Sequence, residues 1–196
     1  MTRLPVYILA GGRSSRFGSD KARASLHGRP LLRHVAAMLE PVAARLTVVA
    51  DCCGKYDDLG LRTLADQQPG LGPLAGLHTA LGDLAPEDHW LLLCSCDAAV
   101  VRGEWLRRLI AGRSAEHDAV AFRSSRWQPM PGLYARTALP VIAHCIHGRN
   151  RSMQNLLDQL RSISLALPTD WPEHWQINTP QDLDRMQSSG ACRRSP

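Results

Sequence analysis

A loop rich in glycine and basic residues follows a short apolar run near the start of the chain. The apolar run is Val6–Ala10, and the loop contains Gly11, Gly12, Arg13, Ser14, Ser15, Arg16, Gly18 and Lys21. Glycine lets the backbone turn sharply and lets an anion approach backbone N–H groups without a Cβ in the way. The basic side chains and the loop amides supply positive charge and hydrogen-bond donors. This combination predicts a site for a polyphosphate.

Two aspartates follow other apolar runs and are candidates for the same chemistry. Asp97 comes just after Trp90–Cys94, the strongest strand pattern in the chain, and Asp66 follows a short strand predicted at 61–64. A carboxylate at the end of a buried strand is costly to bury unless a positive group meets it, and Mg²⁺ on a nucleotide phosphate is one such group. We therefore predict that Asp97 is a magnesium ligand. The alternatives are that Asp97 caps the next helix and that Asp66 is an ordinary turn residue.

The loop does not match the two best-known phosphate-binding motifs. A Walker loop requires G-x-x-x-x-G-K-[ST], but Gly18 is followed by Ser-Asp-Lys at 19–21. The loop glycines also do not fit the G-x-G-x-x-G of a Rossmann fingerprint. The residues His-Cys-Ile-His at 144–147 are poorly spaced for zinc, because these helical neighbours do not all face one point. Because neither phosphate-binding motif fits, the glycine-rich loop must follow a different one.

Strand and helix patterns alternate along the chain. We predict strands at 6–10, 46–50, 61–64, 90–94, 119–122 and 163–167, and helices at 31–45, 73–84, 104–111, 137–145, 152–160 and from Thr179–Pro180 onward. Pro41 should kink the first helix or end it early, and Pro129 and Pro131 make any strand around them an edge strand or an irregular one. The alternation predicts an α/β fold class, a three-layer Rossmann-like domain with a mostly parallel central sheet. In such sheets ligands bind at the carboxyl ends of the strands, where the glycine-rich loop, Asp66 and Asp97 fall.

Length and composition indicate one globular domain. We assign residues 1–187 to a single domain and residues 188–196 to a flexible C-terminal tail. The net charge of +5 fits a site for anionic small molecules, and no basic patch interleaved with aromatic residues predicts nucleic-acid binding. No apolar run approaches the roughly 20 residues that cross a bilayer, and no signal peptide is expected before the first strand. We therefore expect a cytoplasmic protein whose six cysteines are thiols.

The glycine-rich loop resembles a known signature. The pattern L-A-G-G-x-S-x-R-x-G-x-D-K, read from Leu9 to Lys21, is similar to that of nucleotidyltransferases with a GT-A-like fold, the nucleotide-diphospho-sugar transferase fold. The length and the later segments are most similar to the molybdenum cofactor guanylyltransferase family. These segments are Pro69–Gly76, Cys94–Asp97, Gly148–Ser152 and Asn178–Leu183. The matches extend from Val6 to about Met186 and so cover nearly the whole chain.

The resemblance implies a role for each matching residue. The nucleotide-binding residues it implies are Leu9, Ala10, Gly11, Gly12, Lys21, Asp66 and Asp97. The catalytic residues are Arg16, Lys21 and Asp97, with Asp97 also the Mg²⁺ ligand. The residues expected to bind the acceptor are Arg149, Arg151 and Asn178. Gly76, near the start of a predicted helix, is expected to let a ligand come close. This account requires Lys21 and Asp97 to share one cleft.

The reaction that the resemblance implies is transfer of GMP from GTP to molybdopterin. A terminal phosphate of the acceptor attacks the α-phosphate of GTP, pyrophosphate leaves, and the guanine dinucleotide form of the cofactor results. Because the attacking oxygen is already an anion, no serine, cysteine or histidine nucleophile is required. The main requirement is to bring two polyanions together, which calls for positive charge and positioning. Transient contact with molybdenum-insertion proteins or molybdoenzyme chaperones is also expected.

Three segments depart from the family pattern. The family's D-x-P reads Asp97-Ala98-Ala99, and its Asn at the end of a strand falls near Ala50 or Asp51. Its H-P-T/Q-P-L segment reads Gln-Pro-Met-Pro at 128–131. These changes leave two alternatives open. One is a related nucleotidyltransferase that uses CTP or another phosphorylated acceptor, and the other is a non-catalytic nucleotide-binding accessory protein.

Overall fold

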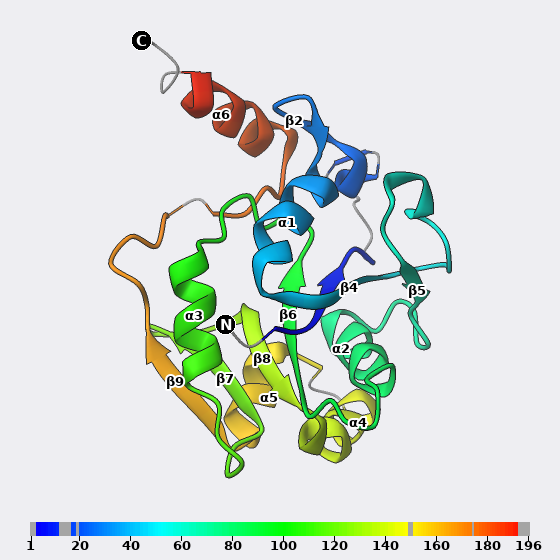
Figure 1. Cartoon of the computed structure of the whole chain (residues 1–196), viewed down its shortest axis with the longest axis vertical. Helices are drawn as coiled ribbons and strands as arrows, with labels where there is room; N and C mark the ends of the chain where they lie inside the picture. Colours follow the sequence, from blue (N-terminus) through cyan, green and yellow to red (C-terminus); the bar gives the residue numbers. More distant parts are fainter. Residues whose placement is uncertain (1–2, 12–16, 19, 149–150, 174, 192–196) are drawn as a thin grey trace.

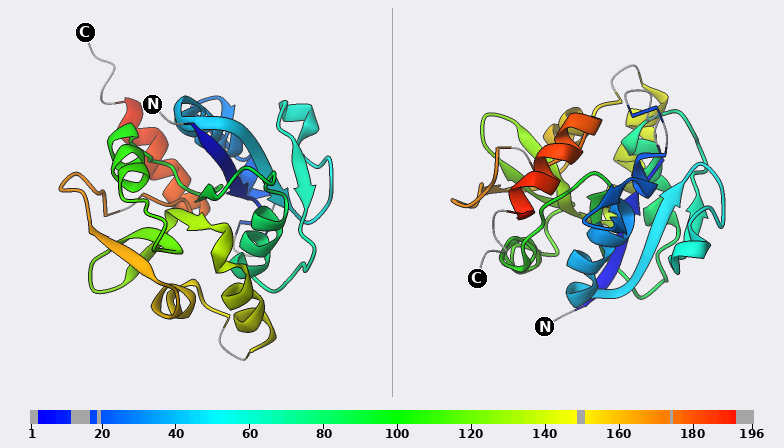
Figure 2. Two further views of the ribbon diagram at one scale, coloured as in Figure 1. Left: turned by 60° about the horizontal axis from the view of Figure 1, so that its bottom comes forward. Right: turned by 90° about the horizontal axis from the view of Figure 1, so that it is seen from above.

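Seven strands form one sheet at the centre of the molecule. The computed structural model describes residues 3–11, 17–18, 20–148, 151–173 and 175–191. The strand order across the sheet is β5-β4-β1-β6-β8-β7-β9, and helices cover both faces (Figures 1 and 2). These strands are β1 (Leu4–Leu9), β4 (Ala43–Ala50), β5 (Thr63–Ala65), β6 (Trp90–Ser95), β7 (Ala119–Arg123), β8 (Trp127–Ala135) and β9 (Ser162–Ala166). A separate two-stranded hairpin consists of β2 (Ser25–Leu26) and β3 (Arg29–Pro30).

Most neighbouring strands of the central sheet are parallel. β1 pairs in parallel with β4 and β6, β4 pairs with β5, and β7 pairs with β9. β8 is antiparallel to both β6 and β7, so β8 begins at the edge where β6 ends. The predicted α/β class with a mostly parallel sheet is confirmed. The carboxyl ends of β5, β4, β1 and β6 therefore open, in that order, onto the edge where ligands bind in such sheets.

In the part of the chain that the structure describes, six α-helices and four short 3₁₀ turns accompany the strands. The α-helices are α1 (Leu31–Leu39), α2 (Pro73–Gly82), α3 (Gly103–Ala111), α4 (Leu139–His147), α5 (Met153–Gln159) and α6 (Pro180–Ala191). The 3₁₀ turns are η1 (Lys21–Arg23), η2 (Glu40–Val42), η3 (Asp57–Leu59) and η4 (Arg136–Ala138). As predicted, the helix that starts near residue 31 ends early, because Pro41 lies in the η2 turn.

The last helix begins where the sequence predicts and ends later. The Thr179 hydroxyl accepts a hydrogen bond from the N–H of Asp182 at 3.2 Å, which is the expected helix cap, and Pro180 is the first helical residue. α6 then continues to Ala191, past residue 188, where we predicted that a tail begins. The polar composition of this stretch concealed the helix, because only one side of α6 packs on the protein. The rest of the predicted tail, 192–196, lies outside the described residues.

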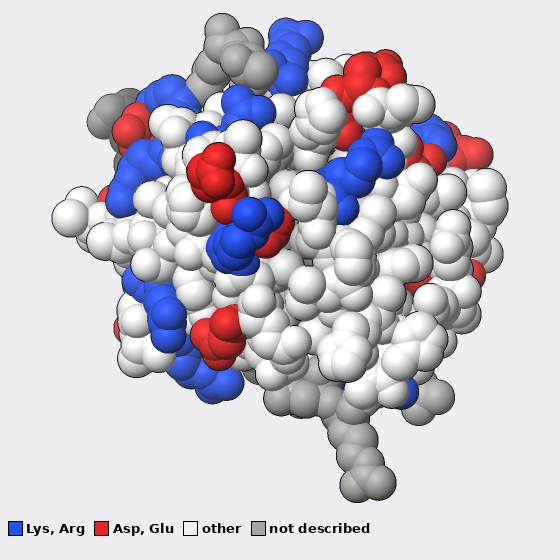
Figure 3. Space-filling view, turned by 90° about the horizontal axis from the view of Figure 1, so that it is seen from below, with Lys and Arg blue, Asp and Glu red and all other residues white. Residues whose placement is uncertain are grey.

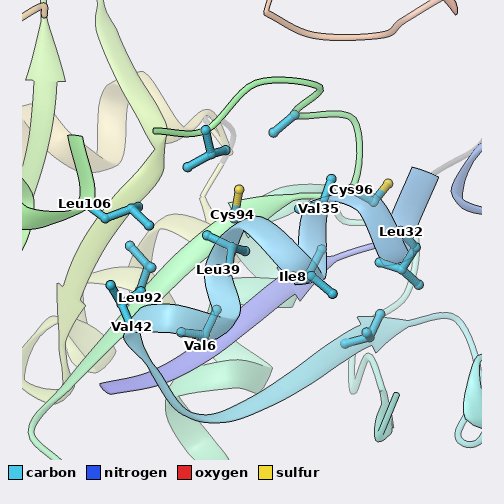
Figure 4. Packing of buried hydrophobic residues seen from close by; sticks show 14 of the residues in the cluster. Val6, Ile8, Leu32, Val35, Leu39, Val42, Leu92, Cys94, Cys96 and Leu106 are labelled. Atoms are coloured by element: carbon cyan, nitrogen blue, oxygen red, sulfur yellow. The ribbon is translucent and has the colours of Figure 1, made fainter. Parts of the chain in front are cut away.

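The sheet separates two apolar layers. Val6 and Ile8 point to one face of β1, and Tyr7 and Leu9 point to the other, as the two-residue period of a strand requires. The first face packs against α1 and α3, and Figure 4 shows Val6 and Ile8 close to Leu39 of α1. The second face packs against α2, α4 and α5. Since all four side chains are less than 9% exposed, β1 is held in the middle of the core and fixes the start of the glycine-rich loop.

The proline-containing strand β8 lies inside the sheet. Our edge-strand alternative is therefore wrong, and the predicted irregularity is confirmed. Ala121 pairs with Gly132 and Phe122 pairs with Gln128, so residues 129–131 bulge out of the ladder, where their prolines need not donate a hydrogen bond. A Cβ added to Gly132 would lie 2.5 Å from the carbonyl oxygen of Pro129, which explains the glycine at this bulge.

The opposite end of the molecule carries charges of both signs. Seen from below, basic and acidic side chains lie close together on this face (Figure 3). Two ion pairs lie near the amino ends of strands, Arg45 with Asp88 at 2.6 Å and Arg161 with Asp118 at 2.8 Å. Among the described residues, the cysteines are free thiols, as predicted, and no helix has the length and apolar character to cross a membrane.

Candidate functional site

Lys21 and Asp97 form an ion pair at the carboxyl ends of β1 and β6. Lys21 begins η1, which follows the loop after β1, and Asp97 comes just after β6. The distance from Lys21 Nζ to Asp97 Oδ2 is 2.9 Å, and the two side chains are 16% and 13% exposed. The prediction that these residues meet at one edge of the sheet is confirmed, and their roles in binding stay predictions.

The backbone on both sides of Asp97 is held by neighbouring segments. The N–H of Cys96 donates to the carbonyl of Leu9 at 3.0 Å, and the N–H of Ile177 donates to the carbonyl of Asp97 at 2.9 Å. The side-chain amide of Gln176 also donates to Asp97 Oδ1 at 3.3 Å. Sequence reasoning missed Gln176, although it stands just before the Asn178–Leu183 motif. These contacts fix the direction of the carboxylate toward Lys21.

Asp20 fixes the turn that carries Lys21. Its carboxylate accepts a hydrogen bond from the N–H of Ala22 at 3.1 Å and so caps η1. The hydroxyl of the fully buried Tyr56 donates to both carboxylate oxygens of Asp20 at 3.1 Å. Burial and the nearby Asp20 carboxylate raise the pKa of Tyr56, which keeps this hydroxyl a donor. Lys55 Nζ lies 3.7 Å from Asp20 Oδ2. The turn is thereby tied to the segment that follows β4.

Asp66 lies at the end of β5 and is held by two hydrogen bonds. Its Oδ1 accepts from the N–H of Gln68 at 3.0 Å and from the hydroxyl of Thr79 at 3.2 Å. The first bond is the turn-forming contact expected of an aspartate before a loop. The second bond reaches Thr79 in the second half of α2 and ties the carboxylate to that helix. Asp66 is half-buried, so it also faces the cavity described next.

A cavity of about 640 Å³ lies beside the carboxyl ends of β4 and β5. We call it the β5-side cavity, and its lining residues are Gly11, Asp51, Lys55, Asp66, Pro69, Gly70 and Gly72. Gly70 and Gly72 have positive φ angles, of 86° and 81°, which explains why glycine occupies both positions of this loop. The cavity thus contains two of the predicted nucleotide-binding residues, Gly11 and Asp66.

A second cavity, of about 300 Å³, lies where β8 begins. We call it the β8-side cavity, and its lining residues are Arg126, Trp127, Gln128, Pro129, Met130, Gln154, Trp175 and Gln176. The Trp175 ring contacts Trp171 with ring centroids 5.1 Å apart, and Trp171 stacks on Trp105 at 4.6 Å, so this wall is rigid. Gln176 joins the cavity to Asp97. Sequence reasoning did not find this cavity, because its walls come from three separate segments.

Leu9 packs directly against Gly76, and the nucleotide-binding role of Leu9 stays a prediction. Leu9 is 8% exposed, and a Cβ added to Gly76 would lie 2.8 Å from Leu9 Cδ2. Gly76 is therefore small because Leu9 packs against it, which corrects our expectation that it admits a ligand. Ala10 is half-buried, and its N–H donates to the carbonyl of Val49 at 2.9 Å. These two contacts set the point where the glycine-rich loop leaves the sheet.

The remaining predicted residues are more widely placed. Gly12, Arg16 and Arg149 lie outside the described residues. Arg151 donates from Nε to the carbonyl of Ile146 at 2.7 Å and so closes the end of α4. Asn178 is exposed beside the start of α6. Neither Arg151 nor Asn178 lines the two cavities, and their acceptor-binding role stays a prediction.

The residues around Asp97 suit a magnesium ion that is shared with a nucleotide. Within the described ranges, no three His, Cys, Asp or Glu side chains gather as a metal cluster. Burial raises the pKa of the nearby Cys94 and Cys96 thiols to about 12, so both stay neutral. Mg²⁺ typically takes one or two carboxylates and completes its shell with substrate phosphates and water. A single carboxylate at Asp97 fits that pattern.

The fold and this edge of the sheet define a class of protein. A mostly parallel sheet with a glycine-rich loop after β1 and an aspartate after β6 is the arrangement of nucleotidyltransferases with the nucleotide-diphospho-sugar transferase fold. The crystal structure of molybdopterin-guanine dinucleotide biosynthesis protein A from Archaeoglobus fulgidus has this fold. It superimposes with a TM-score of 0.81 at 23% identity, covering 96% of this chain and 100% of that one.

Sequence comparisons identify the family. The model of the MobA-like NTP transferase domain matches residues 6–163. A probable molybdenum cofactor guanylyltransferase from Deinococcus radiodurans is 36% identical, with 97% of each chain covered. Another from Nostoc sp. is 34% identical over 95% of this chain and 92% of the relative. The chain therefore belongs to the family of MobA-like NTP transferases that includes these molybdenum cofactor guanylyltransferases.

Proposed function

We propose that this protein transfers GMP from GTP to molybdopterin, in a reaction that depends on Mg²⁺. An oxygen of the acceptor's terminal phosphate forms a bond to the α-phosphorus of GTP. The bond between that phosphorus and the oxygen bridging to the β-phosphate breaks, and pyrophosphate leaves with the bonding electrons. The products are the guanine dinucleotide form of the cofactor and pyrophosphate. The names of the relatives support this donor and acceptor.

The observation that carries the proposal is the position of the Lys21–Asp97 pair. The strand order puts β1 and β6 between the strands beside the two cavities, β4 and β5 on one side and β8 on the other. A nucleoside in the β5-side cavity would extend its phosphates toward Lys21. An acceptor in the β8-side cavity would present its phosphate from the opposite side, next to Gln176. The α-phosphate and the attacking oxygen then meet beside Asp97.

The chain's own residues supply charge and position. The Lys21 ammonium acts as a point charge that stabilises the triphosphate and the departing pyrophosphate. Asp20 aims Lys21 by capping η1, and the contacts to the carbonyl and side chain of Asp97 hold that carboxylate in place. Mg²⁺ held by Asp97 would add Lewis-acid stabilisation of the phosphate oxygens. Arg16 and the loop amides are proposed to contact the same phosphates.

Pyrophosphate release tests the proposal. The purified protein is incubated with Mg²⁺ and molybdopterin together with GTP, CTP, ATP or UTP, and pyrophosphate is followed by a coupled assay. We expect release with GTP, at a rate lowered at least about 100-fold by Asp97→Asn. Asp88→Asn is the matched control, because Asp88 pairs with Arg45 at the other end of the sheet and should leave the rate unchanged.

Two results would redirect the assignment. Release with CTP in place of GTP would identify a related nucleotidyltransferase with a different donor. Nucleotide binding with no pyrophosphate under any combination would indicate a non-catalytic accessory protein. A wild-type rate in Asp97→Asn would reject Asp97 as the metal ligand while leaving the transfer reaction itself in place.

A further inference from the structure

Asp51 and Lys55 form a charged pair on the wall of the β5-side cavity. Asp51 follows the last residue of β4, and its Oδ1 lies 2.8 Å from Lys55 Nζ. The Asp51 side chain is 61% exposed and that of Lys55 is 27% exposed, so both have atoms open to the cavity. Ala50, which precedes them, is fully buried and offers no side chain to a ligand. In the segment that follows β4, Asp51 and Lys55 are the residues that line the cavity.

The ammonium group of Lys55 is held from several sides. Besides Asp51, Nζ lies 3.7 Å from Asp20 Oδ2 and 5.5 Å from the centre of the Tyr56 ring. The hydrogen bond from Lys55 lowers the pKa of Asp51, and despite partial burial the carboxylates raise the pKa of Lys55, so both groups stay charged. An exposed ion pair contributes little to stability on its own. The contacts that anchor Lys55 therefore serve mainly to hold the charges of Asp51 and Lys55 at a fixed spacing.

The two charges match the hydrogen-bonding edge of guanine. Guanine presents two neighbouring donors, N1–H and the N2 amino group, and an adjacent acceptor, O6. A carboxylate accepts from two donors at once, and an ammonium beside it donates to the acceptor. Adenine and cytosine instead present a ring nitrogen with a lone pair beside an amino group. That ring nitrogen is an acceptor, and it would repel the carboxylate oxygen that faces it. The edge of guanine is thus the one that this pair favours.

We propose that Asp51 and Lys55 read the base of the donor nucleotide, with Asp51 accepting from N1–H and N2 and Lys55 donating to O6. This inference rests on the proposed function, because it assumes that the β5-side cavity holds the nucleoside. Asp20 contacts Lys55 and also caps the turn that carries Lys21. The base-reading pair and the phosphate-binding lysine therefore share one support, which aligns the two ends of the same nucleotide.

Comparing GTP with ITP separates the two contacts. The base of ITP has O6 and N1–H but lacks the N2 amino group. Calorimetric affinities for GTP, ITP and ATP are measured for the wild type, Asp51→Ala, Lys55→Met and the control Asp57→Asn. Asp57 is an exposed carboxylate on the same segment, and it does not line the β5-side cavity. Circular dichroism and the melting temperature establish that each variant is folded.

We expect distinct patterns from the two variants. Asp51→Ala should lower GTP affinity about 10- to 100-fold and ITP affinity by a smaller factor, so the preference for GTP over ITP declines. Lys55→Met should lower GTP and ITP affinities by similar factors and reduce discrimination against ATP. Asp57→Asn should match the wild type. These results together would support the inference.

Two outcomes would overturn it. If the wild type prefers GTP and both variants keep the wild-type ratios of GTP to ITP and GTP to ATP, the base is read elsewhere and only this inference fails. If the wild type itself does not prefer GTP, the inference and the guanylyl specificity of the proposed function fail together.

Discussion

Replacing Lys21 by methionine should change cation and nucleotide binding in opposite directions. The Lys21 ammonium lies 2.9 Å from the carboxylate proposed to bind Mg²⁺. At an effective dielectric constant of about 20, two unit charges at this distance attract by about 6 kcal/mol. Desolvation and solvent screening at side chains that are 16% and 13% exposed reduce this to a net of about 1–2 kcal/mol. A cation that binds Asp97 in the absence of nucleotide must compete with that contact.

The expected effects follow from this competition. Lys21→Met should raise the affinity of the nucleotide-free protein for Mn²⁺, used as a spectroscopic substitute for Mg²⁺, by about 5- to 30-fold. The same variant should bind GTP about 10- to 100-fold more weakly, because it lacks a charged donor to the phosphates. Mn²⁺ binding is measured by electron paramagnetic resonance without nucleotide, and GTP binding by calorimetry.

A control and a refuting result complete the test. Arg62→Met removes a 2.7 Å ion pair to Asp83, away from both cavities, and should leave Mn²⁺ affinity unchanged. If Lys21→Met lowers Mn²⁺ affinity or leaves it at the wild-type value, the ammonium does not compete with a cation at Asp97. Unchanged GTP affinity would separately reject Lys21 as a phosphate contact.

Three further changes test the supporting structure and the β8-side cavity. Gly132→Ala should lower the free energy of unfolding by about 2–4 kcal/mol in urea melts, because its Cβ would meet the backbone carbonyl of Pro129; an unchanged midpoint would refute this. The hydrogen bond from Arg161 lowers the pKa of Asp118 from 3.8 to about 2. The ionised carboxylate therefore stabilises the folded state at pH values above 3.8, and this stabilisation is lost as the pH falls toward 2. Asp118→Asn should therefore cost about 1–2 kcal/mol at pH 7 and flatten the acid dependence of unfolding, whereas an unaltered acid profile would contradict the assignment. Arg126→Ala should raise the KM for the acceptor several-fold without changing that for GTP, and equal effects on both would place the acceptor elsewhere.

Much of the fold could be predicted because local patterns determine it. The apolar runs of β1 and β6 favour buried strands whatever packs against them. The residues that follow these strands place the functional groups at the carboxyl-end edge of the sheet. β8 was harder to interpret, because Pro129 and Pro131 normally exclude a strand from the middle of a sheet. Only the bulge, which removes these residues from the ladder, permits it there. A bulge depends on pairing with distant strands, so a local pattern does not reveal it.

The residues of the candidate site also fall into a group that the sequence could predict and a group that it could not. Lys21, Asp66 and Asp97 could be predicted, because each follows a recognisable strand and belongs to a long motif. Gln176 and Lys55 could not, because their roles depend on where separate segments meet in space. The Gln176 amide donates a hydrogen bond to Asp97, which lies 79 positions earlier in the sequence. Lys55, in the segment after β4, pairs with Asp20 in the segment after β1. Motifs identify residues that act through the local backbone, whereas supporting contacts emerge only from the tertiary structure.

The structure also explains the missing proline after Asp97. The family's D-x-P would place proline at position 99, where it would stiffen the loop. Here the N–H of Ala99 donates to the carbonyl of Trp175 at 2.8 Å, a bond that proline cannot make. Ala98 also pairs with Gln176 in an isolated bridge, and Ala98 and Ala99 are 0% and 3% exposed. The loop is therefore held by hydrogen bonds and burial in place of a constrained ring, and the substitution no longer argues for a non-catalytic protein.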